Sequence, residues 1–147
     1  MNKKQAAIVL LPITLLLFLV ISGCAGIMDA GRPPATDEEI LRTKINLLSQ
    51  AKKDNKWDIV YRMYDAAYQK TISEQAFLAM NRGVTFGEYT IEKIEIDQTG
   101  RKAQVTIRSD VMAQGMNFKN SPAVQHWIKE DGEWHCQVKT AEQLFSR

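Results

Sequence analysis

Hydrophobic and polar residues follow two different periods along this chain of 147 residues. Between residues 36 and 80 the apolar residues return at the spacing of one face of an α-helix. Between residues 103 and 111 they alternate with polar residues, as on a strand that has one face in water. Helices in the first half and antiparallel strands in the second predict an α+β fold.

Three helices are predicted in the first half. The first begins at a capping box, with Thr36 as the N-cap and Glu39 three positions later, and it ends within the polar residues 52–56. A second helix with an aromatic face covers residues 57–68. A short third helix follows a new start signal and ends at an Arg-Gly pair, within residues 71–83.

The strands of the second half begin with an irregular one. Its apolar residues change phase between Ile91 and Ile94, which predicts a β-bulge and therefore a bent sheet. Residues 97–100 form the turn to the next strand, which carries Arg108 and Asp110 on its polar face.

The last two strands form a hairpin at Asp131 and Gly132, and two registers are open. A three-residue loop places His126 opposite Cys136 on the core-facing side. A two-residue turn places Trp127 opposite Cys136 and sends His126 to the other face. The first register is preferred here, because it gathers more apolar residues on one face.

Three segments of the sequence resemble the nuclear transport factor 2-like superfamily. They are residues 55–61, residues 72–77 and the hairpin of residues 127–134, and the resemblance extends over residues 36–140. It implies N-terminal helices packed on a bent antiparallel sheet, in the form of a cone with a pocket. The superfamily contains isomerases, dehydratases, cyclases and binding modules, so it does not by itself imply a reaction.

Six residues are candidates for lining such a pocket: Tyr61, Tyr64, Tyr68, His126, Trp134 and Cys136. Tyrosine hydroxyls can orient a ligand, although aromatic stripes at helical spacing more often pack in a core. A partly buried histidine could act as a base, but no third group that would orient it is evident. We therefore assign no catalytic residue. No metal or cofactor is predicted, because neighbouring residues of a strand, such as His135 and Cys136, point to opposite faces.

The first residues read as an export signal. Residues 6–21 carry no charge and follow two lysines, and this run is shorter than the roughly 20 residues that span a membrane as a helix. The run ends in Ile-Ser-Gly-Cys, which resembles the lipobox of bacterial lipoproteins. That resemblance implies cleavage after residue 23, lipid on Cys24 and, because Ala25 follows, an outer-membrane location in a Gram-negative cell.

The domain organisation is then a signal peptide (1–23), a flexible tether (24–35) and one domain (36–147). The chain has 19 basic and 17 acidic residues; removal of Lys3 and Lys4 leaves 17 of each. This balance argues against nucleic acid as a partner. We expect a non-enzymatic envelope lipoprotein that binds a small apolar ligand or another protein. The alternatives are a small isomerase or dehydratase that uses His126 and a tyrosine, and a homodimerisation module that pairs through the polar face of the sheet.

Overall fold

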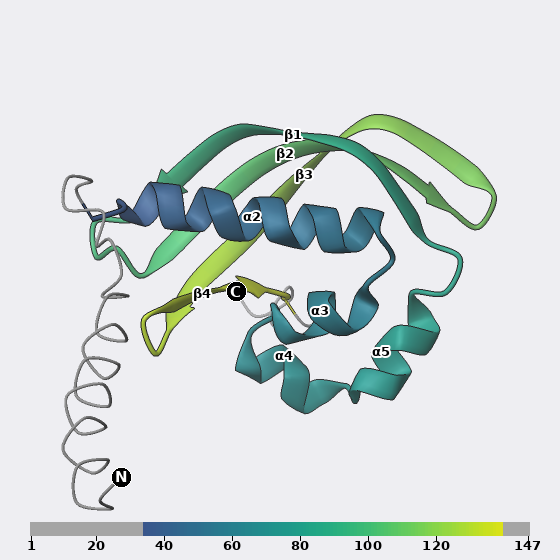
Figure 1. The fold of residues 1–147 in the computed structure, drawn as a ribbon, viewed down its shortest axis with the longest axis horizontal. Helices are drawn as coiled ribbons and strands as arrows, with labels where there is room; N and C mark the ends of the chain where they lie inside the picture. Colours follow the sequence, from purple (N-terminus) through teal and green to yellow (C-terminus); the bar gives the residue numbers. More distant parts are fainter. Residues whose placement is uncertain (1–33, 140–147) are drawn as a thin grey trace, which may run out of the picture. The chain divides into compact units, whose positions relative to one another are not determined.

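The computed structural model describes residues 34–139. Within this range four helices precede four strands, which confirms the predicted α+β order, and the strands arch over the longest helix (Figure 1). The elements are α2 (Asp37–Lys53), α3 (Trp57–Arg62), α4 (Ala66–Thr71), α5 (Glu74–Met80), β1 (Thr85–Ile96), β2 (Lys102–Ala113), β3 (Met116–Glu130) and β4 (Glu133–Gln137).

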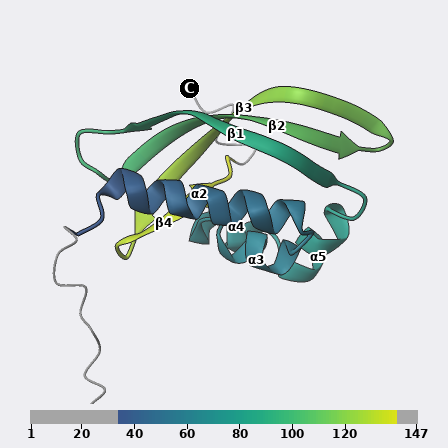
Figure 2. The same cartoon turned by 45° about the horizontal axis from the view of Figure 1, so that its top comes forward.

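Helix α2 begins as the sequence predicts. The hydroxyl of Thr36 accepts a hydrogen bond from the backbone N–H of Glu39 at 3.2 Å, and the Glu39 carboxylate accepts one from the Thr36 N–H at 2.8 Å. The face of α2 that carries Leu41, Ile45 and Leu48 is completely buried. This face packs against the sheet and thereby fixes the positions of the later residues of α2 relative to the strands (Figure 2).

The prediction of one helix over residues 57–68 was wrong, because two short helices, α3 and α4, cover this range. Between them the chain forms a bridge to strand β4. The N–H of Asp65 donates to the carbonyl of Cys136 at 3.1 Å, and the N–H of Cys136 donates to the carbonyl of Met63 at 2.9 Å. These bonds replace helical ones, and the side chain of Asp65 starts α4 by accepting from the N–H of Tyr68. The third predicted helix is confirmed as α5, with Ser73 as its N-cap.

The four strands form one antiparallel sheet in the order β1-β2-β3-β4, and all four described helices lie on the same side of it (Figure 2). The predicted bulge is confirmed: the register of β1 against β2 shifts between Ile91 and Lys93, and again between Phe86 and Tyr89. Each bulge bends the strand locally. Together they curve β1 over α2.

The hairpin of β3 and β4 has the register that we did not prefer. Trp127 pairs with Cys136, and Glu130 pairs with Glu133, so the turn has two residues. Both turn residues have positive φ, 49° at Asp131 and 86° at Gly132, which is the geometry that Asp-Gly favours in such turns. This register buries Trp127 in the core, and burial of that large ring outweighs the apolar pattern that we followed.

Several predictions lie outside the described residues. They are the signal peptide of residues 1–23, the lipid on Cys24 and nearly all of the tether. No helix among residues 34–139 is long and apolar enough to cross a membrane.

Candidate functional site

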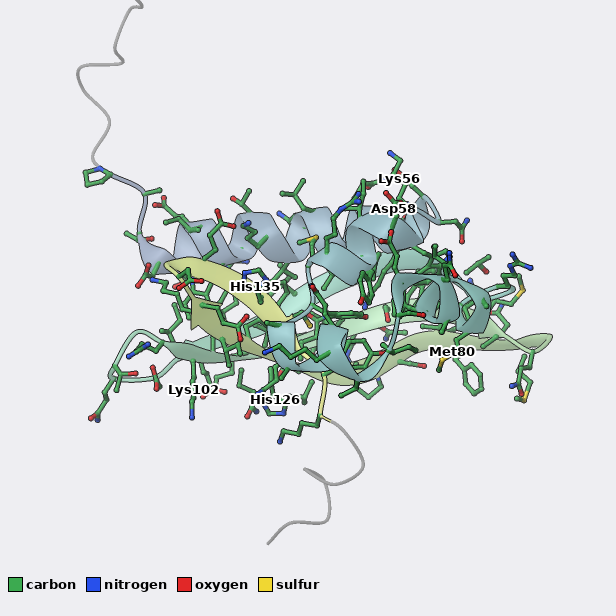
Figure 3. The ribbon with its side chains drawn as sticks, turned by 90° about the horizontal axis from the view of Figure 1, so that it is seen from below. Lys56, Asp58, Met80, Lys102, His126 and His135 are labelled. Carbon is green, nitrogen blue, oxygen red and sulfur yellow. The ribbon has the colours of Figure 1, made fainter. Side chains whose placement is uncertain are left out.

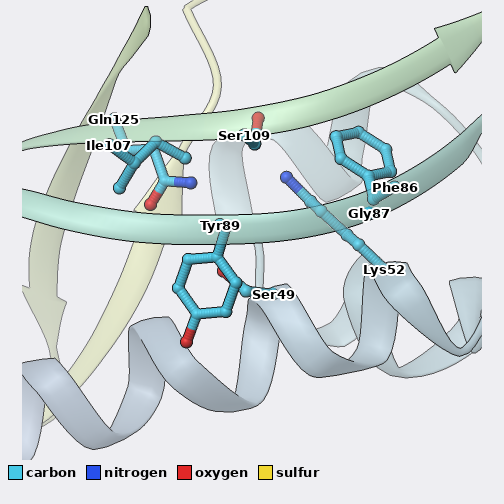
Figure 4. A pocket seen from close by; sticks show the side chains of 8 residues that line it. All are labelled: Ser49, Lys52, Phe86, Gly87, Tyr89, Ile107, Ser109 and Gln125. Atoms are coloured by element: carbon cyan, nitrogen blue, oxygen red, sulfur yellow. The ribbon is translucent and has the colours of Figure 1, made fainter. Parts of the chain in front are cut away.

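A lysine on the buried face of α2 defines the site. Leu41, Ile45 and Leu48 occupy the inward positions of the helix, and Lys52 takes the next position of the same stripe. Its side chain extends from α2 towards the sheet, into a space that Ser109 also lines (Figure 4). The helix therefore places a cation at a position where the spacing of its buried residues predicts an apolar side chain.

The ammonium group of Lys52 has aromatic rings for neighbours. Its Nζ lies 5.3 Å from the ring centroid of Phe86 and 5.9 Å from that of Tyr64, both within the range of a cation–π contact. Among the described residues it has neither a hydrogen bond nor an ion pair with a carboxylate. Burial lowers the pKa of Lys52, and the nearby thiol of Cys136 raises it by a smaller amount.

A small cavity surrounds this group, between α2 and the first three strands. Its walls come from Ser49 and Lys52 of α2, Phe86, Gly87 and Tyr89 of β1, Ile107 and Ser109 of β2, and Gln125 of β3. The cavity has a volume of about 20 Å³. This is somewhat more than one water molecule needs, so the cavity as it stands holds a very small group.

Gly87, one of the cavity residues, leaves no room for a larger side chain where β1 meets β2. A Cβ atom on Gly87 would lie 2.9 Å from the Cβ of Asp110 on the neighbouring strand, so only glycine fits there without a shift. Tyr89 comes from the same irregular part of β1, and its hydroxyl donates to the side chain of Asn46 on α2. The bulge of β1 thus lies at the cavity wall, and Tyr89 links this part of the strand to α2.

The three candidate tyrosines lie together, but they pack as core residues. The rings of Tyr61, Tyr64 and Tyr68 surround Phe77 with centroid distances of 5.5, 5.6 and 6.3 Å. The Tyr61 hydroxyl already donates to backbone carbonyl groups, at 2.9 Å in the case of Ile72. Burial raises the pKa of Tyr64, which also lies beside Cys136. None of the three lines the cavity at Lys52.

Trp134 and Cys136 are core residues of β4. Trp134 is 1% exposed and Cys136 is 5% exposed. Burial raises the pKa of the Cys136 thiol to about 11, against an opposing influence of Lys52. The thiol is therefore protonated at neutral pH, when it is a poor nucleophile.

His126 lies on the opposite face of the sheet from the helices. It pairs with Gln104 and Gln137 across the two neighbouring strands, and it borders an open surface depression together with Lys102 (Figure 3). The prediction that His126 faces the core was wrong because the hairpin turn has two residues. Partial burial lowers the pKa of His126, with a smaller influence from Lys139. The histidine and the tyrosines thus do not form one site.

Arg108 and Asp110 lie on that outer face, as predicted, but they do not pair with each other. Arg108 contacts Glu92 at 2.5 Å, and Asp110 contacts Lys119 at 2.9 Å. No group of three or more His, Cys, Asp or Glu side chains in residues 34–139 could hold a metal ion.

Sequence reasoning missed Lys52, Ser109 and Gln125. We took Lys52 as part of the polar end of the first helix, although it continues the spacing of Leu41, Ile45 and Leu48. That spacing was the available signal. A charged residue in phase with a buried stripe is rare, and it is therefore informative.

Comparisons with known proteins give a fold. No protein-family model matches the sequence, and no curated protein matches it. A solved structure of a SEC-C motif containing protein from Psychrobacter arcticus has a TM-score of 0.53 at 14% identity, over 75% of this chain and 63% of that one. The chain thus spans less than two thirds of that protein. This match shows a shared fold and carries no information on activity.

Two further solved structures have TM-scores below 0.5, so no conclusion about this chain is drawn from them. A SEC-C motif containing protein from Rhodopseudomonas palustris has a TM-score of 0.49 at 16% identity, over 75% of this chain and 81% of that one. A protein described as a nuclear transport factor 2-like transpeptidase, from Campylobacter jejuni, has a TM-score of 0.37 at 16% identity, over 71% of this chain and 100% of that one.

Proposed function

We propose that this domain binds a small ligand in the cavity between α2 and the sheet, and that it does so as a lipid-anchored protein of the bacterial envelope. The single observation that carries the binding role is Lys52, an ammonium group that ends in this cavity without an ion-pair partner in the described part of the chain. A largely buried charge without a counter-ion costs stability, and groups perturbed in this way gather at functional sites, which supports a binding role for Lys52.

We further propose that the fold is of the nuclear transport factor 2-like kind. Helices come first, the sheet is antiparallel and bent by two bulges in β1, and the cavity lies between the sheet and the longest helix. Those are the features that the sequence resemblance implies. The sheet has four strands in sequence order, and residues 63–65 hydrogen-bond to β4 at Cys136.

Binding is better supported than catalysis by the groups at hand. His126 lies on the far face of the sheet, and the Tyr61 hydroxyl is already used by backbone carbonyl groups. The thiol of Cys136 is protonated at neutral pH. Apart from the Lys52 amine itself, the described core has no positioned base or nucleophile that could act on a ligand in the cavity, and no second group that would orient or assist that amine is positioned there.

The envelope location rests on the pattern of the first 25 residues alone. Mass measurement of the denatured full-length product, made in a bacterium that processes lipoproteins and purified in mild detergent, tests it. We expect loss of residues 1–23 and a mass increase that corresponds to lipid on Cys24. Cys24→Ser should remain uncleaved and without lipid. An unmodified N-terminus in both proteins would refute the anchor and leave the binding role untouched.

Native mass spectrometry of the same purified protein tests the binding role. We expect an additional mass that is lost on denaturation, and this mass identifies the class of the ligand. Lys52→Met should lose it. The matched control is Lys70→Met, which removes the same charge from an exposed site on α4. A bare protein mass for both wild type and Lys70→Met would argue against a retained ligand.

A second candidate function is the binding of another protein in a groove between α2 and α3. This groove contains apolar side chains that are unusually accessible, with Leu47 55% exposed and Ile59 38% exposed. If the groove joins two copies of the chain, native spectra will contain a dimer that Leu47→Glu removes. Met80→Glu is the control, because Met80 is an exposed apolar residue outside the groove. A dimer unaffected by Leu47→Glu would exclude the groove as its interface.

A further inference from the structure

The cavity at Lys52 presents hydrogen-bond donors from several elements. The side-chain oxygen of Gln125 accepts from the indole N–H of Trp127 at 3.1 Å, so the amide nitrogen remains for other partners. In the close view this nitrogen and the Lys52 ammonium point towards each other (Figure 4). The hydroxyls of Ser49 and Ser109 line the same space. Because hydroxyls can also donate, Ser49, Ser109 and Gln125 can each offer a proton to a guest, whereas the Tyr89 hydroxyl already donates to Asn46.

Carboxylates are missing from this lining. Glu88, next to the cavity residue Gly87, is exposed and pairs with Lys53 on the surface at 2.5 Å. The buried carboxylate of Asp65 accepts from the backbone N–H groups of Tyr68 and Val138, each at 3.0 Å. These two acidic groups already have other partners. The site therefore has one cation and several donors, and the described residues supply it with no anion.

We propose that the cavity binds a compact monovalent anion, either free or as the carboxylate head of a larger ligand, with Lys52 as its charge partner and with Gln125 and Ser109 as donors. This assignment rests on the proposed binding function and names the class of ligand. It adds a charged group to the sequence-based expectation of an apolar ligand, because the Lys52 ammonium and polar side chains share the lining with apolar surface.

The size of the cavity favours a compact group. A space that is only somewhat larger than one water molecule admits a halide ion or the oxygens of a carboxylate, whereas the body of a larger ligand would remain at the mouth. The rings of Phe86 and Tyr64 contact the ammonium and hold it in place. A bound anion would then complete the shell of Lys52 from the side of Ser109 and Gln125, by charge-assisted hydrogen bonds.

Thermal unfolding of the full-length protein in detergent, followed by circular dichroism, tests the proposal. Sodium chloride, formate and butyrate are titrated at pH 7 and constant ionic strength, with the bulky morpholinopropanesulfonate anion as the reference salt. An anion that binds the native protein alone raises the midpoint along a saturating curve. We expect Lys52→Met to weaken binding at least about tenfold and Ser109→Ala to weaken it about three- to tenfold. Lys70→Met should bind as the wild type does.

The three salts distinguish the two sources of the anion. A rise with chloride and formate indicates a free small anion, and a rise with butyrate alone indicates the head of a larger carboxylate; either result supports the proposal. Equal curves for the wild type and Lys52→Met would overturn it, as would the absence of any rise over the reference salt. If native mass spectrometry instead finds a ligand without an acidic group, the binding function stands and the assignment of an anion fails.

Discussion

Replacement of Lys52 by methionine should make this protein more stable. Methionine has a similar length and no charge, and it would extend the buried stripe of Leu41, Ile45 and Leu48. The wild-type protein instead places an ammonium group among aromatic rings, and it does so without a carboxylate partner in the described residues. If Lys52 serves binding at the expense of stability, its replacement should raise the stability of the protein and weaken ligand binding.

The size of the effect follows from two opposing contributions. Removal of an ion from water costs several kcal/mol even in a relaxed protein. The contacts with Phe86 and Tyr64 return about 0.5–2 kcal/mol each. The net gain expected for Lys52→Met is therefore about 1–3 kcal/mol in the free energy of unfolding at pH 7. For a domain of this size that corresponds to a rise of roughly 5–15 °C in the melting temperature.

The difference in stability between the wild type and Lys52→Met should depend on pH. Burial lowers the pKa of Lys52 below its usual 10.5, so between the folded and unfolded values the unfolded chain binds more protons than the native one. The stability of the wild type therefore gains from this residue as the pH rises through that window. The advantage of Lys52→Met should be largest below the folded pKa and should disappear by about pH 10.5. Cys136, with its pKa raised to about 11, lowers stability between about pH 9 and 11 in both proteins, so its effect largely cancels in the difference.

Urea unfolding at pH 7 and at several higher pH values, followed by tryptophan fluorescence, measures both quantities. Lys70→Met should be within about 0.5 kcal/mol of the wild type, because its side chain is exposed. If Lys52→Met is less stable than the wild type at pH 7, the ammonium has a stabilising partner and the argument for an unpaired buried cation is refuted. A stability difference that does not change with pH would refute the titration argument in the same way.

The same unfolding assay checks three further predictions. Asp65→Ala should lose about 2–4 kcal/mol, because it removes a helix cap and also leaves the partly buried N–H of Val138 without its acceptor. The exposed cap variant Ser73→Ala should lose only about 1 kcal/mol, and equal losses would contradict this. Gly87→Ala should lose about 1–3 kcal/mol through the contact with Asp110, and wild-type stability in this variant would show that β1 can move aside. Gly132→Ala should lose about 1–2 kcal/mol because its φ is 86°, and an unchanged midpoint would argue against the two-residue turn.

Much of the fold could be predicted because local signals decide it. The cap at Thr36 satisfies the N–H of Glu39 within the same turn, so no distant contact was needed to place the start of α2. The bulge in β1 was also visible, because a change of phase between Ile91 and Ile94 has few other causes within a strand. In each case the residues that show the pattern are the residues that make the structure.

The two errors have a common cause in Cys136, whose backbone makes distant contacts. Its hydrogen bonds to Met63 and Asp65 interrupt the helical spacing of the tyrosines, and its pairing with Trp127 sets the register of the hairpin. Neither contact leaves a local trace near residue 64. The sequence could therefore indicate helical residues and a hairpin here, but the position of the break and the choice of register depend on tertiary packing.

Each polar residue of the candidate site departs from the hydrophobic pattern of its own helix or strand. Lys52 breaks the apolar stripe of α2, and Ser109 breaks the alternation that Ala103, Val105 and Ile107 establish on the inner face of β2. Gln125 lies on the inner face of β3, two positions before the fully buried Trp127. Each departure alone is an ordinary local exception. Their convergence on one cavity, from three elements that are distant in sequence, supports the binding role that we propose.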